Sequence, residues 1–280
     1  MIPQPFDYTS PATLDEALKL LTNENAKPLA GGMSLVPMMK LRLAAPEQLV
    51  DLGRLPGLNT IRESSGQIYI GAMATHYEIE SSALLRAKCP LLPEVAHLIG
   101  DTQVRNMGTI GGSIAHADPA ADYPAALFAL EAKLKLVKAG ASRTITVQDF
   151  FIDTFTTALE PGELIAEITV PVEQSGTGTS YQKVSHPASG FAIVGIAARV
   201  HKSGTKIDWA RIGVTGLSSK GYRATTVEAA ILSGTPEAAA AKVADGVEAN
   251  ADLSASADYR SHLARVYTAR AIKQALSRTS

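Results

Sequence analysis

Two short glycine-rich segments carry residue types that bind phosphate groups. The first is Ala30–Ser34 (Ala-Gly-Gly-Met-Ser), and the second, about 80 residues later, is Thr109–Ser113 (Thr-Ile-Gly-Gly-Ser). Paired glycines let the backbone adopt a positive φ and approach a ligand without a Cβ clash. Successive N–H groups then form a concave anion site, to which a serine hydroxyl adds a donor. The pair predicts a site for the two phosphates of a dinucleotide; the alternative is that each Gly-Gly is an ordinary tight turn.

The residues around these turns refine the prediction. Ser34 can cap a short helix over residues 35–41, which would direct the positive end of that helix toward the same anion. No Gly-x-x-x-x-Gly-Lys-Ser/Thr motif occurs, and Gly-Thr-Gly at 176–178 has Tyr181 where a dinucleotide fingerprint needs its third glycine. The predicted cofactor-binding residues are Ala30, Gly31, Gly32, Met33, Ser34 and Leu35 in the first turn, and Thr109, Ile110, Gly111, Gly112 and Ser113 in the second.

Asp122 follows the second turn and precedes Pro124 by two residues. Proline at this position suits the first turn of a helix, so the carboxylate can serve as the helix N-cap. Alternatively, it can accept hydrogen bonds from sugar or ribityl hydroxyls beside the diphosphate. His116 and Asp118 have no third ligand nearby, so the sequence predicts no metal site.

Lys183 and Phe191 flank a turn that contains proline and glycine. An aromatic ring can stack on a flat heterocycle, and an ammonium group can stabilise an anionic one. The alternative is an edge lysine and a core phenylalanine without a ligand.

The composition excludes several classes of function. The chain of 280 residues has 26 Lys and Arg against 27 Asp and Glu, a net charge of −1, which offers no basic footprint for nucleic acid or an anionic membrane. The single cysteine, Cys89, cannot form an internal disulfide or hold an iron–sulfur cluster alone, and it fits a reducing compartment. No apolar run approaches the length of a membrane span, and the first residues do not resemble a signal peptide. We therefore expect a cytoplasmic protein without an integral membrane segment.

Helix and strand signals mix without the regular alternation of a doubly wound sheet, so the expected class is α+β. Thr13–Glu16 and Thr75–Glu78 have the Thr-x-x-Glu pattern of a capping box, which opens a helix. A connection rich in Gly, Ser and Thr after Val172 divides the chain into regions 1–175 and 176–280. The expected strands are 48–52, 58–62, 67–71, 133–138, 143–147, 180–184, 191–201 and 206–216. The expected helices are 13–21, 91–99 and 122–130, with a further helix that opens at the second capping box. Two or three more helices are expected within 225–277, including the Ala-rich stretch 237–243.

Together these motifs resemble the FAD-binding medium subunit of molybdenum hydroxylases, a family that includes carbon monoxide dehydrogenase and xanthine dehydrogenase-like enzymes. The resemblance rests on the two glycine-rich turns, on Ala-Asp-Pro-Ala-Ala-Asp-Tyr-Pro at 117–124, and on Glu-Pro-Gly-Glu-Leu-Ile at 160–165. It extends from Pro5 to the C-terminal helices. The order and separation of the two turns are its most specific feature.

The resemblance implies a fold of the vanillyl-alcohol-oxidase type. Residues 1–175 would form an FAD-binding domain of two α+β subdomains, and residues 176–280 a C-terminal flavoprotein domain with a three-stranded antiparallel sheet and helices. FAD would be bound non-covalently, with its diphosphate wrapped by the two turns.

The family comparison also implies roles for single residues. Asp122 would meet the ribityl or ribose hydroxyls, and Ile165 would touch the ring system or the adenine region. Lys183 would lie near the isoalloxazine and Phe191 would flank it. The chain departs from the family at Met33, where His or Gln is frequent, and at Phe191, where relatives often have Tyr.

The resemblance implies an electron-transfer subunit rather than a site with its own catalytic residues. The [2Fe-2S] clusters would belong to a small partner subunit and the molybdenum cofactor to a large one, in a dimer of heterotrimers. This chain would pass electrons from the clusters to an external acceptor such as NAD or a quinone. The alternatives are a stand-alone flavin-dependent reductase or oxidase, and a non-catalytic scaffold.

Overall fold

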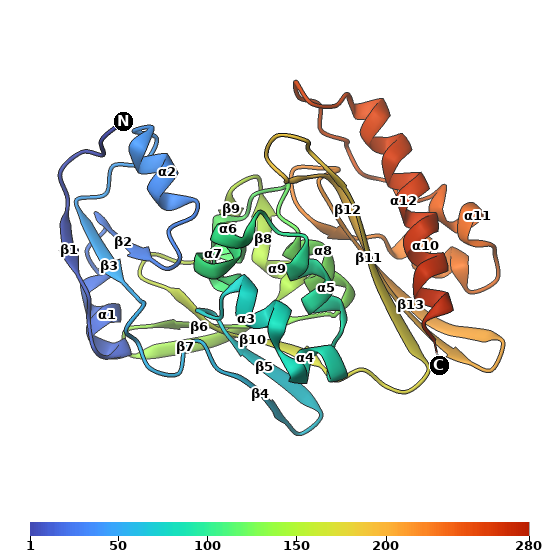
Figure 1. The fold of residues 1–280 in the computed structure, drawn as a ribbon, viewed down its shortest axis with the longest axis horizontal. Helices are drawn as coiled ribbons and strands as arrows, with labels where there is room; N and C mark the ends of the chain where they lie inside the picture. The colour runs from blue at the N-terminus through green and yellow to red at the C-terminus, as the bar shows by residue number, and fades with distance from the viewer. Residues whose placement is uncertain (280) are drawn as a thin grey trace.

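The N-terminal part of the protein is built on a small parallel sheet. The computed structural model describes residues 1–279, and Figure 1 shows this sheet at one end of the molecule. Its strand order is β1-β3-β2, and helix α1 packs against it through the buried Ala17 and Leu18. Thr13 caps α1 by accepting from the Glu16 N–H, as the first capping box predicts. The elements are β1 (Asp7–Thr9), α1 (Leu14–Leu20), β2 (Ala26–Leu29), α2 (Leu35–Lys40) and β3 (Gln48–Asp51).

The central part is a five-stranded sheet with helices packed on it. The strand order is β4-β5-β10-β6-β7, with antiparallel pairs, and its core residues are shared with the helices that follow β5. The second predicted capping box is confirmed, because Thr75 and Glu78 exchange both of their side-chain-to-backbone hydrogen bonds. The elements are β4 (Ile61–Ser64), β5 (Gln67–Gly71), α3 (His76–Ser81), α4 (Ala83–Lys88), α5 (Leu91–His97), α6 (Thr102–Met107), α7 (Ile110–His116), α8 (Tyr123–Ala129), β6 (Lys133–Lys138), β7 (Ala141–Thr146), α9 (Val147–Phe150), β8 (Phe151–Asp153), β9 (Thr156–Thr157) and β10 (Leu164–Pro171).

The C-terminal part is an antiparallel sheet between two layers of helices (Figure 1). Alternate residues of β12 enter different cores, since Ala197 packs with the central helices and Ala198 with α10–α12. Helix α8 lies very close to the inner face, where a Cβ on Gly213 would be 1.8 Å from the Ala125 carbonyl oxygen. The elements are β11 (Thr177–Ser185), β12 (Ala192–Ser203), β13 (Lys206–Thr215), β14 (Tyr222–Arg223), α10 (Thr225–Ile231), α11 (Pro236–Ala240) and α12 (Ala257–Ser277).

Several element boundaries differ from the sequence prediction. Strand β4 begins at Ile61 rather than at Leu58, whose carbonyl instead accepts from the Met73 N–H. Strand β11 begins at Thr177, so Gly178 lies within the sheet and not in a flexible connection. A Cβ there would lie 1.9 Å from the Ala275 carbonyl oxygen, which explains why α12 needs a glycine on β11. A two-residue strand, β14, joins the three long strands of this sheet. The last residue of the predicted region 176–280, Ser280, lies outside the described residues.

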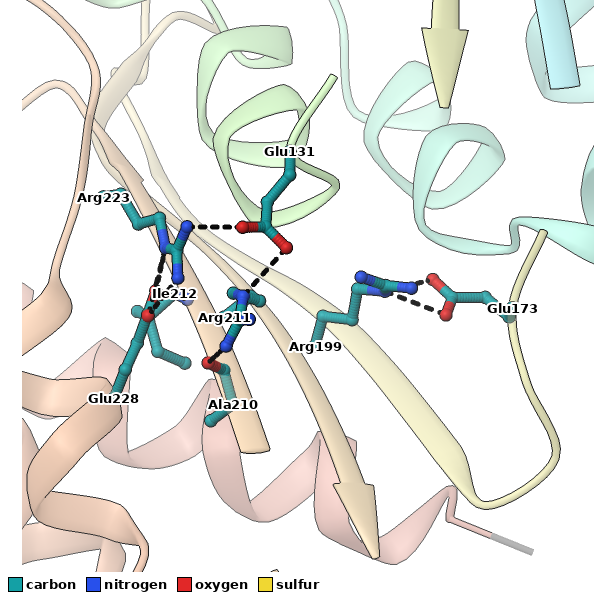
Figure 2. A network of polar contacts seen from close by, with 8 residues as sticks. All are labelled: Glu131, Glu173, Arg199, Ala210, Arg211, Ile212, Arg223 and Glu228. Carbon is teal, nitrogen blue, oxygen red and sulfur yellow. Dashed lines mark hydrogen bonds and ion pairs between the residues drawn. The ribbon is translucent and has the colours of Figure 1, made fainter. Parts of the chain in front are cut away.

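Ion pairs fix the C-terminal sheet against the central part (Figure 2). Glu131, in the turn after α8, accepts hydrogen bonds from Arg211 at 2.9 Å and from Arg223 at 2.6 Å. Glu173, just after β10, accepts two hydrogen bonds from Arg199 at 2.8 Å, and both side chains are largely buried. These contacts set where β11, which carries Lys183, lies relative to α8.

Candidate functional site

The two glycine-rich turns lie directly against each other. A Cβ built on Gly31 would be 1.9 Å from the Met107 carbonyl oxygen and 2.8 Å from Cα of Gly108. A Cβ on Gly112 would be 3.7 Å from Cβ of Ala30. The two turns are therefore neighbours in the fold, as a shared site requires, and their joint binding of a diphosphate stays a prediction.

The first turn, Ala30–Ser34, offers free backbone donors. It leaves β2 and leads into α2, with Gly32 in the left-handed region at φ 72°. Among residues 1–279, no backbone carbonyl accepts from the N–H groups of residues 31–34. Ser34 is the N-cap residue of α2, as predicted, but its side chain makes no capping hydrogen bond to the helix, so its hydroxyl is not used there. The turn can therefore present a row of N–H groups and a hydroxyl to an anion.

The second turn differs, because most of its N–H groups are already bonded. Thr109 is the N-cap of α7 and accepts from the Gly112 N–H at 3.1 Å. Ile110 and Gly111 donate to the carbonyls of Ala74 and Ala72, at 3.0 and 2.8 Å. A Cβ on Gly111 would lie 2.6 Å from the Ala72 oxygen, so this glycine allows close packing on the end of β5. The backbone of the second turn is thus held in place by its own hydrogen bonds, next to the free donors of the first turn.

Asp122 belongs to a buried polar cluster that links α8 to β11. Its carboxylate accepts from Lys183 Nζ at 2.8 Å and from the Tyr181 hydroxyl at 2.6 Å. Lys183 also donates to the Leu98 carbonyl at 2.9 Å. Only 5% of the Asp122 side chain and 1% of the Lys183 side chain are exposed. Asp122 is the N-cap residue of α8, as one alternative predicted, but its carboxylate makes no capping hydrogen bond and instead binds Lys183 and Tyr181.

Burial governs the titration of this cluster. It raises the pKa of Asp122 above its ordinary value, although Lys183 and the Tyr181 hydroxyl act in the opposite direction. Burial, together with the neighbouring Asp122 carboxylate, raises the pKa of Tyr181 well above its usual range. The tyrosine therefore stays a hydrogen-bond donor to Asp122 at neutral pH.

The remaining predicted residues lie in different surroundings. Phe191 is 45% exposed at the end of the turn between β11 and β12, so the alternative of a core phenylalanine is wrong. Met33 is 40% exposed in the first turn. Ile165 is a buried residue of β10 in the core of the central sheet.

The sequence did not predict the role of Tyr181, nor the contact of Gly31 with Met107 and Gly108. Tyr181 and Lys183 are two residues apart on one strand, so their side chains share a face of the sheet. That alternation could have identified the tyrosine. The contact between Gly31 and Met107 could not have been found, because no local signal in the sequence specifies which turns meet.

The geometry fits a cofactor with a diphosphate. Within residues 1–279, the N–H groups of residues 31–34 have no backbone acceptor, and they lie in a turn that packs closely on the second one. Within the described residues, no group of three His, Cys, Asp or Glu side chains could hold a metal ion. None of the helices in that part of the chain combines the length and apolar character needed to cross a bilayer.

Comparison with known proteins agrees with this geometry. Residues 4–173 match the family described as "FAD binding domain in molybdopterin dehydrogenase", and residues 179–275 match the "CO dehydrogenase flavoprotein C-terminal domain". The carbon monoxide dehydrogenase medium chain of Hydrogenophaga pseudoflava is 40% identical over 99% of both chains. The glyceraldehyde dehydrogenase medium chain of Sulfolobus acidocaldarius is 38% identical over 98% of this chain and 99% of the other.

A solved structure of the Hydrogenophaga pseudoflava carbon monoxide dehydrogenase, a form lacking the Mo-pyranopterin moiety, also matches the fold. The matching chain is 41% identical, covers 100% of both chains and superposes with a TM-score of 0.96. The protein is thus an FAD-binding flavoprotein with a mixed α and β fold, and an oxidoreductase subunit. It belongs to the family of FAD-binding medium subunits of molybdenum hydroxylases.

Proposed function

We propose that this chain takes electrons from iron–sulfur clusters of a partner subunit and passes them to an external acceptor such as NAD or a quinone. The observation that supports the proposal is the contact between the two turns. The free N–H groups of residues 31–34 lie next to the hydrogen-bonded backbone of the second turn. Bound FAD supplies the redox chemistry, and the protein binds and orients it. The single cysteine of the chain requires that the clusters belong to another subunit.

Within this proposal, each predicted residue has a defined task. The N–H groups of residues 31–34 and the hydroxyls of Ser34 and Ser113 bind the diphosphate. Asp122 and Lys183 lie beside the ribityl chain and the isoalloxazine, where their mutual ion pair fixes both side chains. The exposed ring of Phe191 flanks the isoalloxazine. Ile165 lines the adenine or ring region from the central sheet.

The proposed partners are a small iron–sulfur subunit and a large molybdopterin subunit, in a cytoplasmic dimer of heterotrimers. The relatives are named as medium chains, which supports an assembly of several subunits. The FAD-binding domain, residues 1–175, and the C-terminal domain, residues 176–280, would enclose the cofactor between them.

Purification under native conditions tests the proposal. We expect a yellow protein that releases FAD on denaturation, copurifies with a larger and a smaller subunit, and transfers electrons only in that complex. A chain that stays colourless after incubation with FAD would overturn the proposed site. Turnover of a substrate by the isolated chain would instead favour a stand-alone reductase or oxidase.

Replacing Gly112 with alanine tests the space between the turns. The new methyl group would meet the Thr109 hydroxyl at 2.9 Å and would otherwise lie 3.7 Å from Ala30, so the protein should still fold. We expect FAD to bind about 10-fold more weakly, because the methyl group narrows the diphosphate site and adds steric strain of about 1.4 kcal/mol to the bound state. Fluorescence titration of the apoprotein with FAD measures this change. An unchanged affinity in a folded variant would show that the diphosphate binds elsewhere.

A further inference from the structure

His76 contacts Gly108, the residue just before the second turn. It is the first residue of α3, and its N–H donates to the Gly108 carbonyl at 2.9 Å. Its imidazole lies against Gly108, since a Cβ built there would be 2.6 Å from Nε2. Its Nδ1 lies 3.2 Å from the hydroxyl of Tyr123 on α8. One buried residue thus ties α3, α8 and the start of the second turn together.

We propose that His76 is a positioning residue that, through Gly108, keeps the second turn (Thr109–Ser113) in its FAD-binding shape, and that protonation of its ring loosens the turn and releases FAD in acid. This inference rests on the proposed diphosphate site. His76 acts through Gly108, which its ring packs against and which Gly31 also contacts.

The packing explains why the neutral ring is required. His76 is only 4% exposed, and its hydrogen-bond partner within residues 1–279 is the uncharged Tyr123 hydroxyl. Arg105 on α6 is the cation that faces it, and Glu80 on α3 is already bonded to Arg105. Asp122, next to Tyr123, is paired with Lys183. A positive charge on His76 would therefore be buried beside the Arg105 cation, and no free carboxylate among residues 1–279 faces it.

The sign of the pH effect follows from this environment. Burial, and to a smaller extent Arg105, lowers the pKa of His76 from its ordinary 6.5 to about 4. A group with a lowered basic pKa favours the closed turn at neutral pH, and this preference is lost as the pH falls from 6.5 toward 4. Between pH 8 and pH 5 the preference for the closed turn should fall about 30-fold.

The test compares FAD dissociation constants of the full chain from pH 8 to pH 5. We expect the wild-type constant to rise over this range by up to about 30-fold, the limit reached when the open turn predominates without FAD. His76→Gln keeps an amide near Tyr123 but cannot take up a proton here, so its profile should be nearly flat. His262→Gln is the matched control, because His262 is exposed on α12; its profile should equal that of the wild type.

The outcomes separate this inference from the proposed function. A His76→Gln variant with the wild-type pH profile, or a flat profile in the wild type, would overturn the role of His76 while leaving FAD binding intact. Absence of FAD binding by the wild type at pH 8 would overturn the proposed site itself. If His76→Gln does not fold, the pKa of the labelled His76 ring is measured by NMR titration of the FAD-bound wild type instead. A pKa below 5 supports the inference, and a pKa near 6.5 contradicts it.

Discussion

Replacing Gly31 with alanine is expected to abolish tight FAD binding and to destabilise the fold. The added Cβ would lie 1.9 Å from the Met107 oxygen and 2.6 Å from its carbonyl carbon, which are backbone atoms that no rotamer change can move. The two turns must therefore separate. Overpacking of this kind costs about 3 kcal/mol, and the same strain weakens FAD binding about 100-fold. Thermal unfolding of the apoprotein and FAD titration measure the two effects.

The matched control is Gly140→Ala. Gly140 has a positive φ, 74°, unlike Gly31, but a Cβ there would meet nothing within 4 Å, and it lies in the turn between β6 and β7. This variant should lose stability through backbone strain alone and keep its FAD affinity. If Gly31→Ala retains wild-type affinity while Gly140→Ala behaves as expected, the close contact of the two turns is not needed for the cofactor.

The glycine-rich turns could be predicted because their signal is local. Paired glycines near a serine permit backbone conformations that other residues avoid, and the two Thr-x-x-Glu sequences likewise predicted the starts of α1 and α3. The long strands β12 and β13 were also predicted, at 191–201 and 206–216, and β12 contains a mostly apolar run because both faces of this sheet are covered.

Features that depend on distant partners could not be predicted in the same way. The sequence placed Thr109–Ser113 in a free turn, whereas Ala72 and Ala74 bind its N–H groups and it opens α7. The Asp122–Lys183 pair joins residues 61 positions apart, and only the packing of α8 on the C-terminal sheet brings them together. Tertiary packing determines which carboxylate pairs with which cation, and no local sequence pattern predicts that pairing.

The same ion pair gives the second large prediction, for Lys183→Met. Loss of the ammonium leaves the Asp122 carboxylate buried with only the Tyr181 hydroxyl as partner, which should cost about 3–5 kcal/mol of the free energy of unfolding. The pKa of Asp122, which burial already raises, should rise further. An acid with a raised pKa favours the fold in its protonated form, so the variant should lose stability as the pH rises through that pKa. Chemical denaturation at several pH values measures both effects.

The control applies the same substitution to Lys138, whose ion pair with Glu160 is exposed; Lys138→Met should leave stability unchanged. The double variant Asp122→Asn and Lys183→Met then separates two roles of the lysine. Without a buried charge, most of the lost stability should return, because the amide oxygen can still accept from Tyr181. If Lys183 contacts the isoalloxazine directly, FAD affinity should stay low in the double variant. If the affinity recovers together with the stability, Lys183 serves the flavin site only by pairing with Asp122.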